Sequence, residues 1–216
     1  MIAQRVENQP LPKRDKRGYY LIKRSFDLVA SFCGLVILSP LFLILIIAIL
    51  IDDFGAPFYS QTRVGKNGRP FRMWKFRSMV TNADELKKQL MAQNEVEGAM
   101  FKMKHDPRIT RVGRVIRKYS LDELPQLYNV LRGDMSLIGP RPPLPEEVAQ
   151  YTDYQRQRLQ VTPGCTGLWQ ATVRNSVSFE EMVEIDLDYI RRQGVKLDLW
   201  ILVQTIKIMI KPNGAY

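Results

Sequence analysis

Residues 28–51 read LVASFCGLVILSPLFLILIIAILI and contain no charged side chain. As one straight helix this stretch would be about 36 Å long, which exceeds the ~30 Å hydrocarbon core of a bilayer. A secretory signal peptide fits poorly, because the apolar run is too long and no small-residue cleavage site follows it. The stretch therefore predicts a membrane-associated segment, and a buried helix of a soluble core is the weaker alternative.

A break is predicted within this segment, at Ser39-Pro40. Pro40 has no N–H to donate to the carbonyl of Val36, so the helix should bend or end there, and the Ser39 hydroxyl can satisfy a freed carbonyl such as that of Leu35. Residues 1–27 carry seven Lys and Arg against three acids, and residues 54–80 hold Lys and Arg but no acid. Because positive flanks favour the cytoplasmic side, a re-entrant hairpin that enters and leaves by the cytoplasmic face is favoured over a crossing.

The 216-residue chain carries 32 Lys and Arg against 22 Asp and Glu, a formal net charge of +10. This balance favours an anionic partner, which could be nucleic acid, anionic lipid or a phosphorylated substrate. A nucleic-acid-binding protein would leave the apolar run unexplained, and no binding motif is present, so no nucleic acid is expected. The single histidine, His105, reads as part of a turn and excludes a His-rich zinc site. Two cysteines exclude a disulfide framework, and no role is predicted for Cys165 in its TPGCTG loop.

Local patterns predict an α+β fold that is mostly helical. A β-hairpin is expected from residues 58–64 and 71–79, whose aromatic and β-branched side chains flank Asn67-Gly68. A short strand within residues 134–143 should lead into a Pro-rich loop. Apolar spacing and capping signals predict further helices at 110–119, 121–132, 145–160, 179–193 and 196–211.

The expected organisation has three parts: a basic N-terminal tail at residues 1–22, a re-entrant membrane helix at 23–53 and a membrane-associated catalytic domain at 54–216. The last predicted helix mixes Leu, Ile and Trp with Lys, which is typical of a helix that lies in the membrane interface. The small β-hairpin and the interfacial amphipathic helices should surround a catalytic core on the cytoplasmic side.

Asp122 and Glu123 are the first candidates for chemistry. Adjacent carboxylates at a helix N-terminus are stabilised as anions, and such a group can be a nucleophile or a metal ligand. Ordinary helix capping is the alternative. The surroundings favour chemistry, because seven basic residues fall between Lys102 and Lys118 against one acid, Asp106, a field suited to phosphates.

Arg141 is the second candidate, because Pro140 and Pro142 hold its loop and leave the guanidinium little entropy to lose on gripping a phosphate. A surface arginine in a Pro turn is the alternative. Lys75 and Arg77 alternate along the predicted strand and so share a face, which could line a pocket or simply be solvated.

Taken together, four stretches resemble the bacterial sugar transferases of the monotopic polyprenyl-phosphate phosphoglycosyl transferase superfamily. They are KRSFDLV…LSPLFL, QTRVGKNGRPFRMWKFRSM, RKYSLDELPQLYNVLRGDMSLIGPRP and TPGCTGLWQ, which occur in the family's order from about Lys23 to the C-terminus. The nearest likeness is to hexose-1-phosphate transferases that initiate capsular or exopolysaccharide synthesis. Many of those have a long N-terminal region of several helices that is not seen here, so the sequence resembles the minimal catalytic domain.

The resemblance implies a reaction. Such enzymes transfer a sugar-1-phosphate from a UDP-sugar to undecaprenyl phosphate at the cytoplasmic face of the bacterial inner membrane, releasing UMP. Asp122 matches the aspartate that attacks the β-phosphorus and forms a covalent aspartyl-phosphosugar intermediate. Glu123 matches the glutamate that binds Mg²⁺.

The same resemblance implies binding residues. Arg117 matches the family's phosphate-binding arginine, and Lys75 matches the lysine of its KFRSM-like stretch. The loop Pro140-Arg141-Pro142 matches the nucleotide-binding Pro-Arg-Pro loop. The helix break of the family matches Ser39-Pro40.

Two alternatives to this function stay open: a membrane glycosyltransferase that releases UDP, and a membrane-surface scaffold without catalysis. The sequence does not identify the sugar, for which glucose-1-phosphate is the first expectation, galactose-1-phosphate the second and an N-acetylated sugar the third. Membrane lipid is an expected partner, and a homo-oligomer is left open.

Overall fold

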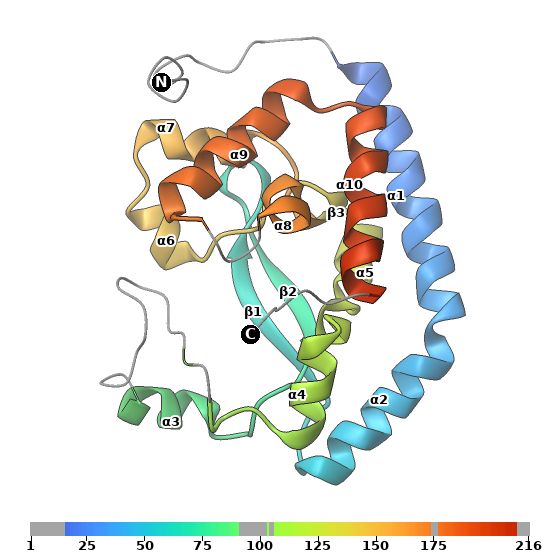
Figure 1. The fold of residues 1–216 in the computed structure, drawn as a ribbon, viewed down its shortest axis with the longest axis vertical. Coiled ribbons are helices and arrows are strands. Elements are labelled where there is room, and N and C mark those ends of the chain that lie inside the picture. Colours follow the sequence, from blue (N-terminus) through green and yellow to red (C-terminus); the bar gives the residue numbers. More distant parts are fainter. Residues whose placement is uncertain (1–15, 91–102, 104–105, 174–176, 211–216) are drawn as a thin grey trace.

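The structure is a computed structural model that describes residues 16–90, 103, 106–173 and 177–210. Most of the predicted basic tail and the turn predicted at His105 lie outside these residues. Within them the chain is mostly helical, with two small sheets of two strands each, in agreement with the predicted α+β class (Figure 1). Long helices line one side of the molecule, and shorter elements surround a β-hairpin on the other.

The apolar run forms α1 (Arg17–Ile37) and α2 (Ser39–Asp52), two helices bent by 59° at a short break. Helix α1 begins inside the range that the sequence analysis assigned to the tail. By length and composition alone, no single helix among the described residues could cross a bilayer, whereas this bent pair together could, as a broken span or as a re-entrant loop.

The break lies at Leu38, next to the predicted Ser39-Pro40 pair. The Ser39 hydroxyl donates to the carbonyl of Val36 at 2.8 Å, not to that of Leu35. The Val36 carbonyl is the one that Pro40 leaves without its usual N–H donor, so the serine repairs the bond that the proline removes.

The predicted β-hairpin is present as β1 (Phe58–Val64) and β2 (Pro70–Phe76), which pair antiparallel. Asn67 and Gly68 both have positive φ in the connecting turn, which these two residue types tolerate best. The second strand ends at Phe76 and not at residue 79. A further short helix, α3 (Ala83–Leu90), follows the hairpin.

The basic helix predicted at 110–119 is α4 (Arg111–Lys118), in which Ile116 is buried and Val115 is exposed. The helix lies so close to the backbone of Ser78 that a Cβ on Gly113 would be 2.0 Å from the Ser78 carbonyl oxygen.

The helix predicted at 121–132 is divided into a 3-10 turn at Leu121–Glu123 and α5 (Gln126–Arg132). Pro125 stands at the junction, where its missing N–H costs no hydrogen bond. Asp122 and Glu123 therefore lie in the 3-10 turn that precedes α5. Gly133 ends α5 with a φ of 92°, as predicted.

A second, parallel sheet pairs β3 (Ser136–Ile138) with β4 (Gly164–Thr166). The first strand was predicted, but the second lies in the TPGCTG stretch, which the sequence analysis took for a loop. Close backbone contact explains the glycines there, because a Cβ on Gly164 would lie 2.1 Å from the backbone nitrogen of Gly139.

The helix predicted at 145–160 is broken into α6 (Pro145–Ala149), α7 (Asp153–Arg156) and a 3-10 turn at Gln157–Gln160. The break occurs because Thr152 caps α7, accepting a hydrogen bond from the backbone of Gln155.

Three helices complete the fold: α8 (Leu168–Thr172), α9 (Phe179–Arg192) and α10 (Val195–Ile210). The last two agree with the predicted helices, and α9 begins with the expected Ser178–Glu181 capping box. Their inner faces form the largest buried apolar cluster, to which α9 contributes Val183 and Leu187 and α10 contributes Ile201.

Helix α1 is fastened to this body by polar contacts. Lys23 on α1 forms an ion pair with Asp198 on α10 at 2.7 Å. Arg24 donates to two carbonyls at the C-terminal end of α5, and the buried Asp27 accepts from the backbone N–H of Leu137 in β3. The apolar segment is therefore held on the rest of the fold by buried polar groups as well as by packing.

Candidate functional site

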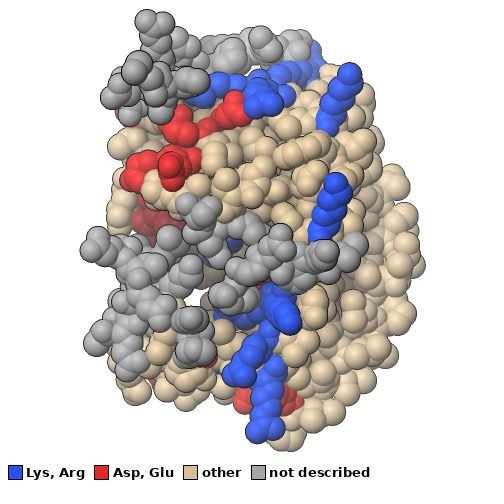
Figure 2. Space-filling view, viewed as in Figure 1, with Lys and Arg blue, Asp and Glu red and all other residues tan. Residues whose placement is uncertain are grey.

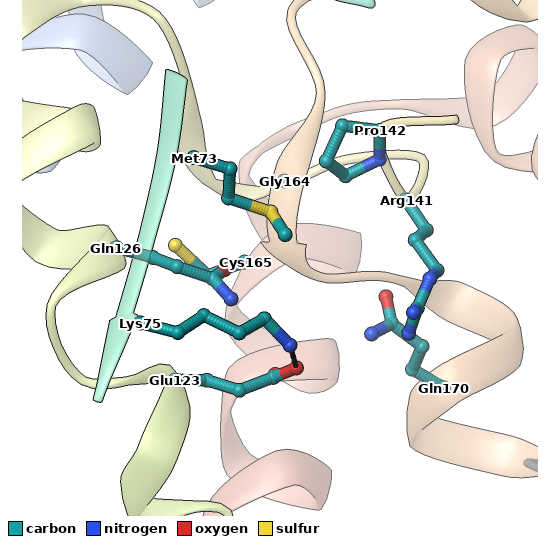
Figure 3. A pocket seen from close by; sticks show the side chains of 9 residues that line it. All are labelled: Met73, Lys75, Glu123, Gln126, Arg141, Pro142, Gly164, Cys165 and Gln170. Atoms are coloured by element: carbon teal, nitrogen blue, oxygen red, sulfur yellow. Dashed lines mark hydrogen bonds and ion pairs between the residues drawn. The ribbon is translucent and has the colours of Figure 1, made fainter. Parts of the chain in front are cut away.

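A small cleft lies between β2, the start of α5, the loop after β3 and the short helix α8 (Figure 3). Because its walls come from segments between positions 73 and 170, only the folded chain brings them together. The lining residues are Met73, Lys75, Glu123, Gln126, Arg141, Pro142, Gly164, Cys165 and Gln170.

Four of the residues singled out in the sequence line this cleft: Lys75, Glu123, Arg141 and Pro142. Asp122 immediately precedes Glu123, and Arg117 lies close enough to Asp122 for its charge to affect that carboxyl.

Four of the remaining residues lie elsewhere. Pro140 supports the loop, where its carbonyl accepts from the backbone of Gly164 at 2.9 Å. Ser39 and Pro40 lie at the helix break. Arg77, which alternates with Lys75 along the chain, does not line the cleft and bonds Asp53 at the end of α2.

An ion pair connects two elements that form one wall of the cleft. The ammonium of Lys75, on β2, lies 2.6 Å from Oε1 of Glu123, in the 3-10 turn before α5 (Figure 3). The two side chains are 21% and 29% exposed, so solvent screens the pair and its contribution to stability is modest. Its main effect is to fix where the carboxylate points.

Asn129 holds these two elements together. It is fully buried on α5, and its carboxamide accepts from the backbone N–H of Trp74 at 3.0 Å and donates to the carbonyl of Arg72 at 2.7 Å. Asn129 thus serves β2 as a neighbouring strand would. The position of Lys75 relative to the dyad follows from this contact.

The two carboxyl groups of the dyad have different electrostatic surroundings. Burial raises the pKa of Asp122 to about 6, although the charges of Lys75 and Arg117 limit the rise. Burial also acts on Glu123, but Lys75, Arg141 and other positive groups outweigh it, so its pKa is lowered. At neutral pH both groups are ionised, and Asp122 is the one nearer to protonation.

The loop that carries Arg141 is held in place by hydrogen bonds from β1. Arg63, which is 7% exposed, donates to the carbonyl of Pro142 at 3.1 Å, and the backbone N–H of Val64 donates to that of Pro143 at 2.9 Å. Burial and the charge of Arg141 lower the pKa of Arg63 to about 10, so it stays cationic at neutral pH. The sequence analysis did not single out Arg63, because nothing in its β-strand distinguishes it from a surface residue.

Behind the loop lies a buried ion pair between Arg158 and Asp186, with side chains 2% and 1% exposed. Two guanidinium nitrogens of Arg158 contact Oδ2 of Asp186 at 2.6 and 2.9 Å, and a third donates to the hydroxyl of Tyr151. Arg158 also reaches the carbonyl of Arg141 at 3.5 Å. The pair therefore joins α9 to the segment that supports the loop.

Five of the lining residues were not predicted as site residues, among them Cys165 and Gln170. Cys165 lies in β4, and burial raises its thiol pKa well above the ordinary value, so it does not supply a thiolate nucleophile. Gln170 lies on α8, where its carboxamide oxygen is buried without a hydrogen-bond partner among the described residues. Neither has a sequence signal of its own, since both depend on chain segments that meet only in the fold.

The carboxylates present suit a metal ion only in part. Among the described residues, no group of three or more His, Cys, Asp or Glu side chains is placed to hold a metal. Mg²⁺, however, often takes one or two carboxylates and completes its shell with water and substrate phosphate. Asp122 and Glu123 fit that kind of site, and do not fit a cage made of protein alone.

The side of the molecule formed by α1, α2 and α10 is apolar and exposed. Figure 2 shows a broad surface with few charges on the side of α1 and α10, whereas acidic side chains gather over α6, α7 and α9. The most exposed large apolar residues of the bent pair and α10 include Leu21, Ile22, Ile37, Ile44, Ile51, Leu199 and Trp200. An exposed apolar area of this kind marks a membrane or protein contact.

Comparison with known proteins agrees with this geometry. A family model described as bacterial sugar transferase matches residues 18–212. The chain is 44% identical over 201 residues to the galactosyl transferase CpsE of Streptococcus agalactiae and 45% identical over 216 residues to the undecaprenyl-phosphate galactose phosphotransferase of Salmonella typhimurium. These alignments cover 93% and 98% of this chain but 44% of each relative, so the chain spans less than half their length. It is also 40% identical to the exopolysaccharide production protein ExoY of Rhizobium meliloti, over 91% of this chain and 88% of that protein.

Proposed function

Because the chain belongs to the bacterial sugar transferase family, we propose that it transfers a hexose-1-phosphate from a UDP-sugar to undecaprenyl phosphate, releasing UMP. The product is a polyprenyl-diphosphate-linked sugar, and its formation is the first membrane step of exopolysaccharide or capsule assembly. One relative is named an undecaprenyl-phosphate galactose phosphotransferase, and glucose was the first expectation from the sequence. UDP-galactose and UDP-glucose are therefore the donors to test first.

One observation carries this proposal: Lys75, Glu123 and Arg141 reach a single cleft from three separate elements, with Asp122 beside them. A diphosphate is an anion that must be bound by cations before an anionic nucleophile can approach it. The cleft offers cations on both walls and carboxylates on one. A scaffold that only bound a membrane would not need carboxylates directed into a phosphate-binding cleft.

The transfer proceeds in two displacements at the β-phosphorus. In the first, a carboxylate oxygen of Asp122 forms a bond to that phosphorus, and the bond from it to the oxygen shared with the α-phosphate breaks, so UMP leaves. In the second, a phosphate oxygen of undecaprenyl phosphate attacks the same phosphorus, and the bond between that phosphorus and the Asp122 carboxylate oxygen breaks. The covalent intermediate lets a soluble donor and a lipid acceptor use one site in turn.

The other residues have supporting roles in this scheme. Arg141 and Lys75 bind the diphosphate, and Arg117 binds a phosphate beside Asp122. Glu123 and the substrate phosphates would hold Mg²⁺, which when bound withdraws negative charge from the diphosphate under attack. Lys75, bonded to Glu123, keeps that carboxylate ionised and oriented.

The apolar helices place this chemistry at a membrane surface. We propose that α1 and α2 form a re-entrant hairpin whose two ends lie on the cytoplasmic face of the inner membrane, with α10 in the interface. The 59° bend and the basic flanks support this arrangement. Thiol labelling of single cysteines at positions 5 and 60 tests it, because a re-entrant hairpin places both on one side and a crossing places them on opposite sides.

The test of function is nucleotide release by purified protein with Mg²⁺ and a panel of UDP-sugars, with and without undecaprenyl phosphate. UMP release with one sugar, together with a stoichiometric burst and a protein mass increase in the absence of acceptor, is expected. Asp122→Asn should abolish the burst and the adduct, whereas the control Asp188→Asn, an exposed acid on α9, should retain both.

Other outcomes would contradict the proposal. Release of UDP would identify a transferase that passes only the sugar. Full activity in Asp122→Asn would remove the nucleophile assignment, and no release with any donor would leave a non-catalytic role.

A further inference from the structure

Gln170 stands out among the lining residues because its polar group is unsatisfied. Its carboxamide oxygen is buried and has no hydrogen-bond partner among the described residues. Figure 3 places its carboxamide beside the guanidinium of Arg141, on the wall opposite Lys75 and Glu123. Gln170 therefore lies in the cleft next to Arg141, which we propose binds the diphosphate of the donor.

A buried acceptor without a donor is costly to a folded protein. Leaving such a group unpaired costs about 1–3 kcal/mol, and most buried polar atoms in native structures do find a partner. An unpaired group that persists calls for an explanation, and one explanation is a functional role in which a bound group completes the hydrogen bond. Gln170 lines the cleft, so a ligand bound there is the candidate donor for its carboxamide oxygen.

The chemistry of the cleft indicates what that ligand group is. Lys75 and Arg141 are cations and attract phosphate oxygens, which cannot donate a hydrogen bond when ionised. The carboxamide oxygen of Gln170 needs the opposite, an N–H or O–H. A UDP-sugar carries both kinds of group beside its diphosphate, on the uracil ring, the ribose and the hexose.

We propose that Gln170 accepts a hydrogen bond from an N–H or O–H group of the nucleotide-sugar donor and so helps to select that donor. This inference rests on the proposed function, since it takes the UDP-sugar as the ligand. Its place beside Arg141, across the cleft from Glu123, makes it a contact to a part of the donor other than the phosphorus that Asp122 attacks.

The first experiment measures donor binding separately from turnover. Titration calorimetry with the best UDP-sugar is carried out on Asp122→Asn, which cannot form the covalent intermediate, with and without Gln170→Met. Methionine has a similar length and no acceptor, so the Kd should rise roughly three- to tenfold, the value of one net hydrogen bond. The control Gln150→Met, an exposed position at the end of α6, should leave the Kd unchanged.

Steady-state kinetics in the otherwise native protein provide a second readout. Gln170→Met should raise the donor KM while kcat changes by less than about twofold, because the contact is present before and during transfer. Thermal unfolding checks that the variant folds. Gln170→Asn keeps the carboxamide but withdraws it from the cleft, so it should show the same KM effect. This variant separates loss of the hydrogen bond from any disturbance of packing by methionine.

Donor analogues identify the group that Gln170 contacts. One arm uses a UDP-sugar methylated at uracil N3, and the others use donors that lack single hydroxyls of the ribose or hexose. The analogue that lacks the contacted group should bind more weakly than the parent donor to the protein that retains Gln170. For that analogue alone, Gln170→Met should cause no further loss of affinity.

The outcomes separate this inference from the proposed function. Unchanged Kd and KM in Gln170→Met, or an added loss of the same size with every analogue, would overturn the role of Gln170 even where UMP release is normal. Failure of UMP release with intact, Gln170-dependent binding of the UDP-sugar would instead overturn the proposed reaction and leave the contact standing.

Discussion

Replacing Arg158 with methionine should destabilise the protein far more than replacing Arg158 and Asp186 together. The two side chains are 2% and 1% exposed and meet at 2.6 and 2.9 Å, so Arg158→Met leaves a carboxyl buried without its cation. Breaking such a pair costs about 3–5 kcal/mol, whereas replacing both partners with apolar residues is often close to neutral. For a domain of this size each kcal/mol corresponds to about 2–4 °C, so Tm should fall by roughly 6–20 °C.

The pH dependence of this loss adds a second check. Burial raises the pKa of Asp186 to about 6 even beside Arg158, and removing the cation raises it further. The folded state then holds a proton that the unfolded state releases above about pH 4. Stability of Arg158→Met should therefore keep falling between pH 6 and pH 8, whereas in the native protein this contribution levels off by about pH 7.

Thermal unfolding followed by circular dichroism, in one detergent at pH 6 and pH 8, measures both effects. The variants are Arg158→Met, Asp186→Leu and the double variant, with Arg192→Met as a control that breaks an exposed pair on the same helix. A single variant within about 2 °C of the native Tm, or a double variant whose loss equals the sum of the two singles, would refute the reasoning.

Three further predictions follow from the walls of the cleft. Asn129→Leu should cost about 2–4 kcal/mol in unfolding free energy, because it strands the buried N–H of Trp74 and a carbonyl of β2, and urea unfolding measures the loss. The pH profile of kcat/KM should fall below about pH 6 as Asp122 takes up a proton, and Lys75→Met should move that limb to higher pH, since the lysine charge lowers this pKa. Arg63→Met should raise the donor KM more than it lowers kcat, because it frees the Pro-Arg-Pro loop without touching the dyad, and initial rates over a donor series distinguish the two effects.

Much of the local structure was predictable from the sequence, because it depends on nearby residues. The hairpin turn at Asn67-Gly68, the end of α5 at Gly133 and the capping box at Ser178 are each fixed within a few positions of chain. The break at Pro40 is local for the same reason. In each case the residue type permits few backbone conformations other than the observed one.

Most of the errors occurred where distant contacts decide the structure. The helix predicted at residues 145–160 is an exception with a local cause, because the cap at Thr152 divides it. The strand at Gly164–Thr166 has no β-branched run that would predict it, and it exists because its glycines let the backbone approach β3 closely. Helix α4 packs by its backbone against Ser78 because Gly113 has no side chain, and no local pattern predicts that contact.

The site shows the same division. Asp122, Glu123 and Arg141 were selected from sequence, because paired carboxylates and a Pro-flanked arginine carry a chemical meaning by themselves. Arg63 and Gln170 were not, since an arginine in a strand and a glutamine in a short helix acquire a role only from what they meet. Arg63 meets a loop carbonyl some 79 positions away, and no pattern in the chain encodes that contact.

The position of α1 links the membrane segment to both walls of the cleft. Arg24 donates to the last carbonyls of α5, the helix that follows the dyad, while Asp27 accepts from the backbone of Leu137 in β3, which leads into the Pro-Arg-Pro loop. A Cβ on Gly34 would lie 3.2 Å from a side-chain carbon of Leu127, so α5 rests closely on α1 as well. Because both walls are bonded to one helix, the proposed placement of α1 in the membrane would also set the height of the cleft. In that arrangement the site would meet the phosphate of the proposed lipid acceptor at the surface without a separate docking movement.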